Sequence, residues 1–272
     1  MDNTTKAYTL FSSSSGNCFY LKDGEDEILI DVGASCKAIS DSLRSLGTSL
    51  DNIKAIFITH EHSDHIKGLE TICKKYDIPV YCTVDTARYI CSVNVPARTK
   101  IKLMEPRSEV KIGSLTVKSA KTPHDSAQSV CYRISLASGS ELGYATDIGC
   151  LTEEVVDTLC GCRYVVIESN HDKTMLKSGS YPLSLKARIL GSHGHLSNDD
   201  CSRFLPALVN FGCESIILAH LSKENNTPEL AYSSAKEWLE RAGYRVGEAV
   251  RLDVAKVNAP VSLIHEKAII EI

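Results

Sequence analysis

Short apolar runs recur along the chain and are typical of buried β-strands, because β-branched and aromatic side chains dominate them. One of the clearest is Ala-Ile-Phe-Ile-Thr at 55–59. The same pattern predicts strands at 8–11, 18–22, 27–32, 79–83, 101–103, 115–120, 130–136, 141–145, 164–168 and 215–219, and terminal strands after residue 242. We therefore expect β-sheets to form the centre of the fold.

Segments with helical spacing separate several of these strands. They span residues 35–46, 67–76, 85–91, 152–159, 198–211 and 228–242. The order is strands followed by mixed helices and strands, and it occurs twice. This order favours an α/β (α+β) fold: a mostly antiparallel two-sheet sandwich with helices outside. Because no low-complexity segment or clear linker interrupts the chain, we expect residues 1–272 to form a single domain.

Composition changes this picture only slightly. With 272 residues, 43% of them hydrophobic, the chain can bury a sizeable core. A formal net charge of −4 without a Lys/Arg-rich block gives no case for nucleic acid, although a basic groove can hide in an acidic total. The chain lacks a signal-peptide pattern and an apolar run of roughly 18 residues. We therefore expect a cytoplasmic protein with no membrane partner, and the oligomeric state stays open.

The eleven cysteines are scattered and odd in number. The closest pair, Cys160 and Cys162, is not a CxxC pair. We expect free thiols of a reducing compartment that mostly fill the core. Zinc binding by these cysteines is the alternative interpretation.

The most informative stretch is the polar turn that follows the apolar run at 55–59. Residues 60–65 read His-Glu-His-Ser-Asp-His, so three of the nine histidines fall within six residues. Imidazole and carboxylate are the ligand types that suit zinc, manganese, iron or nickel. The alternative is a solvated polar turn, but the clustering of histidines favours a metal site.

Four more polar residues directly follow apolar strands, at Asp31, His124, Asp147 and His220. Strand ends that meet at one sheet edge place such side chains in a shared crevice. Each residue alone is as easily a turn former or a satisfied core residue. Their joint occurrence with the histidine turn predicts one composite metal centre.

This arrangement resembles the metallo-β-lactamase superfamily, whose fold is a four-layer αβ/βα sandwich with two mixed sheets, helices on the outer faces and a two-metal site. The resemblance implies that His60, His62 and His124 bind the first metal, and that Asp64, His65 and His220 bind the second. Asp147 would bridge the metals, and Asp31 would support a ligand without binding metal itself. All these ligands are nitrogen or oxygen, unlike the cysteine-bearing lactamases, which argues against β-lactamase activity.

Further motifs are similar to the YycJ/WalJ branch of this superfamily. They are SSGNC at 14–18, ESNHD at 168–172, GHLSN at 194–198 and AHLSKENN at 219–226. The resemblance covers nearly the whole chain and implies 5′→3′ exonuclease activity on DNA, with a DNA end as the partner. It also implies kinship with the PhnP and tRNase Z phosphodiesterases.

Such an enzyme needs two divalent ions, here zinc, manganese, iron or nickel. Metals roughly 3.5–4 Å apart lower the pKa of a shared water and make hydroxide available to attack phosphorus. Asp64 would help to orient that hydroxide. His195 resembles a histidine of the phosphodiesterase relatives that touches the phosphate and gives a proton to the leaving group. Its alternative role is to precede the helix expected from residue 198.

The remaining candidates concern phosphate binding. The small-residue loop at 12–17 is either a flexible hairpin connection or a loop that faces an anion. The candidates are Ser15 and Asn17 in that loop, Lys223 and Asn226 after His220, and His171, for which a substrate contact and a surface turn are equally open. His193 and His265 are expected to be structural or solvent-exposed.

Two other functions remain open from the sequence. No long inserted segment supplies an obvious nucleic-acid arm, so a small-molecule phosphodiesterase acting on a cyclic or modified nucleotide is an alternative. A non-catalytic metal-binding module with the same fold is another. The ligand set alone does not separate these chemistries.

Overall fold

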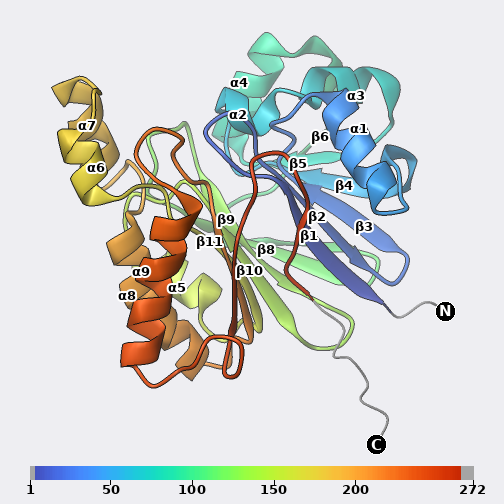
Figure 1. Cartoon of the computed structure of the whole chain (residues 1–272). Coiled ribbons are helices and arrows are strands. Elements are labelled where there is room, and N and C mark those ends of the chain that lie inside the picture. The colour runs from blue at the N-terminus through green and yellow to red at the C-terminus, as the bar shows by residue number, and fades with distance from the viewer. Residues whose placement is uncertain (1–3, 265–272) are drawn as a thin grey trace, which may run out of the picture.

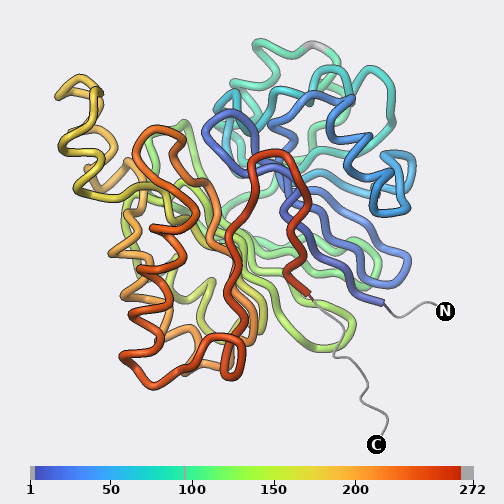
Figure 2. The backbone as a smooth tube through the Cα atoms, viewed as in Figure 1, coloured from blue at the N-terminus to red at the C-terminus, as the bar shows by residue number. Residues whose placement is uncertain are grey.

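Two seven-stranded sheets pack face to face in the computed structural model, which describes residues 4–264 (Figure 1). In spatial order, the first sheet contains β14 (Val261–Ser262), β1 (Thr5–Phe11), β2 (Cys18–Asp23), β3 (Asp26–Ile30), β4 (Ile53–Phe57), β5 (Val80–Cys82) and β6 (Ile101–Leu103). The second contains β13 (Arg251–Val254), β12 (Ser215–Ala219), β11 (Tyr164–Glu168), β10 (Glu141–Ala145), β9 (Val130–Ser135), β8 (Leu115–Lys121) and β7 (Glu109–Ile112). Near the C-terminus the chain crosses from β13 in one sheet to β14 in the other (Figure 2).

Helices cover the outer face of each sheet. The helices are α1 (Cys36–Ser45), α2 (Ser63–Ile66), α3 (Leu69–Lys75), α4 (Val84–Val93), α5 (Glu153–Leu159), α6 (Lys173–Ser178), α7 (Leu183–Leu190), α8 (Asn198–Asn210) and α9 (Pro228–Arg241), with 3-10 turns at Leu50–Asn52 and Val95–Thr99. Buried residues of α1, α3 and α4 share one core with the first sheet, and those of α5, α8 and α9 share another with the second. The expected four-layer αβ/βα sandwich is confirmed.

The core between the sheets explains why the strands are apolar on both faces. In β3, Ile28 and Ile30 point to the other sheet, whereas Leu29 points to the helices. The strands show no alternation of apolar and polar residues, because both faces of each sheet are covered. Rings from opposite sheets meet in this layer, with Phe57 and Tyr132 at a centroid distance of 5.8 Å.

The expectation of mostly antiparallel sheets is wrong. Each sheet is antiparallel in one half and parallel in the other: β3 to β6 run parallel, and so do β10 to β13. Helices connect these parallel strands, as parallel crossovers require. Consequently the carboxyl ends of β3 and β4 meet at one sheet edge, and those of β10, β11 and β12 meet at another.

Several element boundaries also differ from the sequence predictions. The helix expected at 67–76 is found as α3, at Leu69–Lys75, whereas the short helix α2, which begins inside the histidine turn, was not expected. The elements β7, α6 and α7 were also not predicted from the sequence. Those two helices carry few buried residues, Leu176 in α6 and Ile189 in α7, so they lack the apolar stripe that signals a helix.

All eleven cysteines are free, and eight of them are buried. They act as core fillers, as expected, and no cysteine belongs to a candidate metal cluster within residues 4–264. Over the same residues, the structure contains no helix of the length and apolarity that crossing a membrane requires.

Three loops lock together at the ends of β1, β3 and β4. Asn17 N–H donates to the carbonyl oxygen of Asp64 over 2.8 Å, and Gly33 N–H donates to Asn17 O over 2.7 Å. A Cβ at Gly33 would lie only 1.6 Å from Asp64 O. Only glycine permits this close approach of backbone to backbone.

We expect Gly33→Ala to destabilise the protein by about 3 kcal/mol, because the added methyl group must push the backbone of Asp64 away. Chemical denaturation monitored by circular dichroism measures this change. The control is Gly139→Asn, since Gly139 has open space around its Cβ position and a φ of +79° that Asn tolerates. Equal stability of Gly33→Ala and the wild type would contradict the loop arrangement.

Candidate metal centre

Polar residues at the ends of six strands, β3, β4, β8, β10, β11 and β12, converge between the two sheets. Three of them have left-handed backbones: Asp31 after β3 (φ 58°), Asp147 after β10 (φ 56°) and His220 after β12 (φ 56°). Among residues 4–264 only one other non-glycine residue, Arg107, has a positive φ. Such strained conformations cluster at functional sites, where the surrounding structure enforces them.

The first group consists of His60, His62 and His124, whose potential ligand atoms lie within 4.8 Å of one another. His60 and His62 come from the turn after β4, and His124 follows β8. His124 Nδ1 donates to Gly194 O at 3.0 Å, which leaves Nε2 free to face His62 Nδ1 at 3.3 Å. These are the three residues expected at a first metal.

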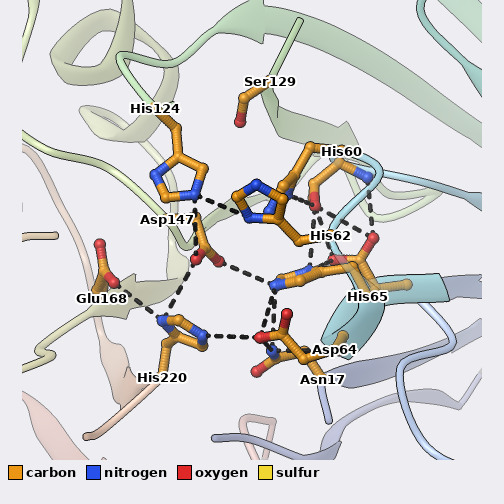
Figure 3. Close-up of polar contacts among 12 residues, drawn as sticks. Asn17, His60, His62, Asp64, His65, His124, Ser129, Asp147, Glu168 and His220 are labelled. Carbon is orange, nitrogen blue, oxygen red and sulfur yellow. Dashed lines mark hydrogen bonds and ion pairs between the residues drawn. The ribbon is translucent and has the colours of Figure 1, made fainter. Parts of the chain in front are cut away.

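The second group consists of Asp64, His65 and His220, again within 4.8 Å of one another (Figure 3). Asp64 and His65 lie on α2, and His220 follows β12 on the other sheet. Asp64 Oδ2 lies 3.4 Å from His220 Nε2 and 3.5 Å from His65 Nε2. These are the residues expected at a second metal.

Asp147 lies between the two groups (Figure 3). Its Oδ2 is 3.1 Å from His65 Nε2, and its Oδ1 is 3.5 Å from His220 Nδ1 and 3.7 Å from His124 Nε2. The carboxylate therefore touches both groups, which is the placement that a bridging ligand needs.

In most of these histidines, one ring nitrogen contacts a hydrogen-bonding group of the same chain, and the other ring nitrogen faces the centre. Asp31 Oδ2 accepts from His65 Nδ1 at 2.8 Å, and Asp31 Oδ1 accepts from Thr59 N–H at 2.9 Å. His60 Nδ1 lies 3.0 Å from the hydroxyl of Thr59. Such outer contacts fix the ring orientation of metal-binding histidines, and the supporting role of Asp31 stays a prediction.

Glu168 is a site residue that was not predicted from the sequence, although the motif ESNHD at 168–172 contains it. Glu168 is fully buried at the end of β11. Its Oε1 accepts from His195 Nδ1 at 2.8 Å and lies 3.0 Å from His220 Nδ1, while its Oε2 accepts from Ile148 N–H at 2.7 Å. A charged residue at the end of the apolar strand predicted at 164–168 was the available signal.

Electrostatics keep the carboxylate of Glu168 charged despite its burial. Burial raises the pKa of Glu168, but His195 and His220 outweigh it and lower this pKa to about 2. Burial lowers the pKa of His220, yet the carboxylates of Asp147, Asp64 and Glu168 raise it to about 10. Burial and the neighbouring histidines lower the pKa of His60, so its ring is neutral and available as a ligand.

The residues present fit divalent cations. His60 Nε2 is buried without a hydrogen-bond partner among the described residues, which is costly unless another group occupies it. It points into a centre of imidazole nitrogens and carboxylate oxygens. This donor set suits zinc, manganese, iron or nickel better than calcium or magnesium.

The candidates for phosphate binding fall into two classes. Ser15 and Lys223 are exposed at the rim, where the Lys223 ammonium donates to Ser15 Oγ at 2.9 Å. Asn17 and Asn226 are buried instead. The Asn17 amide donates to Ser13 O and Asp64, and the Asn226 amide donates to the carbonyls of Ser169 and Asn170 and to Asn198 Oδ1, so neither amide has a donor left for a phosphate.

The other histidines differ in how exposed their side chains are. His195 is 15% exposed and faces the centre. His171 is 1% exposed, so the surface-turn interpretation is wrong, and both of its ring nitrogens lack hydrogen-bond partners in the described chain. His193 is exposed, as one alternative anticipated. His265 lies outside the described residues.

Comparisons with known proteins agree with this geometry. Residues 26–221 match the family model described as "Beta-lactamase superfamily domain". The chain is 35% identical over 257 residues to "Exodeoxyribonuclease YycJ" of Bacillus anthracis, covering 93% of this chain and 96% of the relative. It is 32% identical over 244 residues to "Exodeoxyribonuclease WalJ" of Streptococcus pneumoniae, covering 88% and 89%.

Solved structures resemble the fold at low sequence identity. The metallo-β-lactamase fold protein YhfI from Bacillus subtilis superposes with a TM-score of 0.70 at 15% identity, covering 95% of this chain and 99% of that one. A diphosphatase from the PhnP family superposes with a TM-score of 0.67 at 14% identity, covering 97% and 98%. The chain belongs to the β-lactamase superfamily and is a hydrolase of the metallo-β-lactamase fold.

Proposed function

We propose that this protein is a metal-dependent phosphodiesterase that degrades DNA from a 5′ end. The observation that carries the proposal is the pair of His/Asp groups joined by Asp147, in a chain similar over about nine-tenths of its length to proteins named exodeoxyribonucleases. We further propose that residues 1–272 act as a single domain.

Two divalent ions would be held by the residues already grouped in space. His60, His62 and His124 would bind one ion, Asp64, His65 and His220 the other, and Asp147 both. When bound, such ions supply Lewis acidity toward phosphoryl oxygens and lower the pKa of water, so that hydroxide is available near neutral pH. Zinc, manganese, iron and nickel all suit this donor set.

The protein's own groups would orient the substrate and handle protons. Asp64 is 19% exposed, so one face of its carboxylate is accessible to orient a nucleophilic water. His195 donates from Nδ1 to Glu168, which leaves its Nε2 to give a proton to the leaving oxygen. Burial lowers the pKa of His195, but Glu168 and Asp147 outweigh it and raise that pKa, which favours the protonated form that a general acid needs.

The rim would bind the phosphate. Lys223 and Ser15 are exposed and hydrogen-bonded to each other. Ser15 lies two residues before Asn17, whose side chain contacts Asp64. An ammonium and a hydroxyl at this position would hold the phosphoryl group next to the metal centre. His171 remains a candidate for a substrate contact.

His62→Ala should lower the rate of DNA cleavage by at least about 1,000-fold, because it removes a metal ligand while the fold survives. Digestion of a 5′-labelled and a 3′-labelled oligonucleotide measures both rate and polarity. His193→Ala, an exposed histidine outside the groups, is the matched control. Full activity of His62→Ala, or of chelator-treated protein, would refute the proposal.

Elemental analysis of the purified protein should find about two divalent ions per chain. Asp147→Asn should lose most of this content, since one carboxylate touches both groups, whereas His193→Ala should retain it. Chelation should abolish activity, and one of zinc, manganese, iron or nickel should restore it. A wild-type content of one ion per chain would contradict the two-ion assignment.

His195→Ala should slow DNA cleavage by about 100- to 1,000-fold, the usual contribution of a general acid. The loss should be much smaller on thymidine 5′-(p-nitrophenyl phosphate), because p-nitrophenolate leaves without a proton. Steady-state kinetics on both substrates measure the difference, with Ser192→Ala as the control in the same loop. Equal losses on both substrates would show that His195 does not act as the acid.

A further inference from the structure

The helical hairpin formed by α6 and α7, residues 173–190, stands out from the body of the molecule. Figures 1 and 2 show it in yellow, beyond the helices that cover the second sheet. Leu176 and Ile189 are its buried side chains, whereas Leu183 is 83% exposed. Packing in the hydrophobic core therefore does not explain why the chain forms this hairpin.

Both ends of the α6–α7 hairpin are fixed to the candidate metal centre. α6 begins just after His171, at the end of the β11 loop that carries Glu168. After α7, His195 N–H donates to Ile189 O at 3.0 Å. The Arg188 guanidinium donates to the carboxylate of Asp125, the residue after His124, with Nη2 2.9 Å from Oδ1. The hairpin is thus joined directly to the segments that carry residues of the centre.

The hairpin is also strongly basic. Residues 173–190 contain Lys173, Lys177, Lys186 and Arg188 and no acidic residue, so the rest of this chain of net charge −4 carries −8. The charges of Lys173 and Arg188 are compensated by carboxylates. Lys186 donates to backbone carbonyls at 2.7 and 2.8 Å, and Lys177 is exposed. Within residues 4–264 neither of these two lysines has a carboxylate partner.

We infer that the α6–α7 hairpin binds the single-stranded DNA segment next to the scissile bond through its phosphates. This inference rests on the proposed function. Uncompensated cations on a surface that leads to a nuclease site match a polyanionic strand, and phosphate contacts position such a strand without reading its sequence. The half-buried Tyr181 offers an aromatic ring on which a base can stack, and exposed Leu183 adds apolar surface beside it.

The first test is direct binding. A phosphorothioate single-stranded DNA oligonucleotide, labelled at its 3′ end, is titrated with full-length protein and followed by fluorescence anisotropy. We expect Lys177→Glu to raise the Kd about three- to tenfold, and Lys177→Gln less. The slope of log Kd against log salt should fall by about 0.7 for the lost phosphate contact. An unchanged Kd and slope would overturn the inference.

Lys111→Glu is the matched control, because Lys111 is an exposed lysine of β7. It lies near the turn whose Ser114 N–H donates to Asp26 at 2.7 Å, at the start of β3, whereas the metal centre lies beyond the other end of that strand. We expect no change in its Kd. An equal effect of Lys111→Glu and Lys177→Glu would overturn the inference, since it would show a general charge effect.

The second test separates the hairpin from the chemistry. Lys177→Glu should raise the KM for an oligonucleotide more than that for thymidine 5′-(p-nitrophenyl phosphate), which is too small to reach the hairpin. If DNA binds through Lys177 but is not cleaved, the proposed function fails and the hairpin inference stands. If wild type and Lys177→Glu cleave DNA with the same KM, the hairpin inference fails and the proposed function stands.

Discussion

Buried carboxylates need compensating positive charge, and this requirement organises the centre of the molecule. Asp31, Asp147 and Glu168 are between 0% and 2% exposed. Each faces an imidazole: Asp31 faces His65, Asp147 faces His65 and His220, and Glu168 faces His195 and His220. Removing one member leaves another buried charge without its partner, so the site is built as one unit rather than as separate ligands.

The fold makes this unit possible through the parallel half of each sheet. The carboxyl ends of parallel strands meet at one edge, and two sheets packed face to face bring two such edges together. The chain must then turn sharply after each strand. Asp31, Asp147 and His220 do so in left-handed conformations that cost of order 1–3 kcal/mol each. The interlocked loops at Gly33 and Asn17 hold α2 against this edge.

Two separate surface features surround the metal centre. Lys223 and Ser15 form one part of the rim, and the α6–α7 hairpin extends from the loops that carry Glu168 and His195. A hairpin with so few buried residues contributes little to stability, so its basic side chains suit recognition rather than folding. The same loops that position the proton-handling pair thus also anchor the surface proposed for the strand.

Most of the centre could be predicted from the sequence, because the ligand residues follow strands directly and three histidines crowd one turn. The sequence alone also determined most strand positions, β7 being an exception, since branched apolar runs are local signals. Only the tertiary structure decided which strands run parallel and that Glu168 contacts His195 and His220. It also decided that the side-chain amides of Asn17 and Asn226 form hydrogen bonds within the protein. These properties depend on contacts between residues far apart in the sequence, such as Glu168 and His220, 52 positions apart, and Asn17 and Asp64, 47 positions apart. Local patterns in a chain carry no information about such partners.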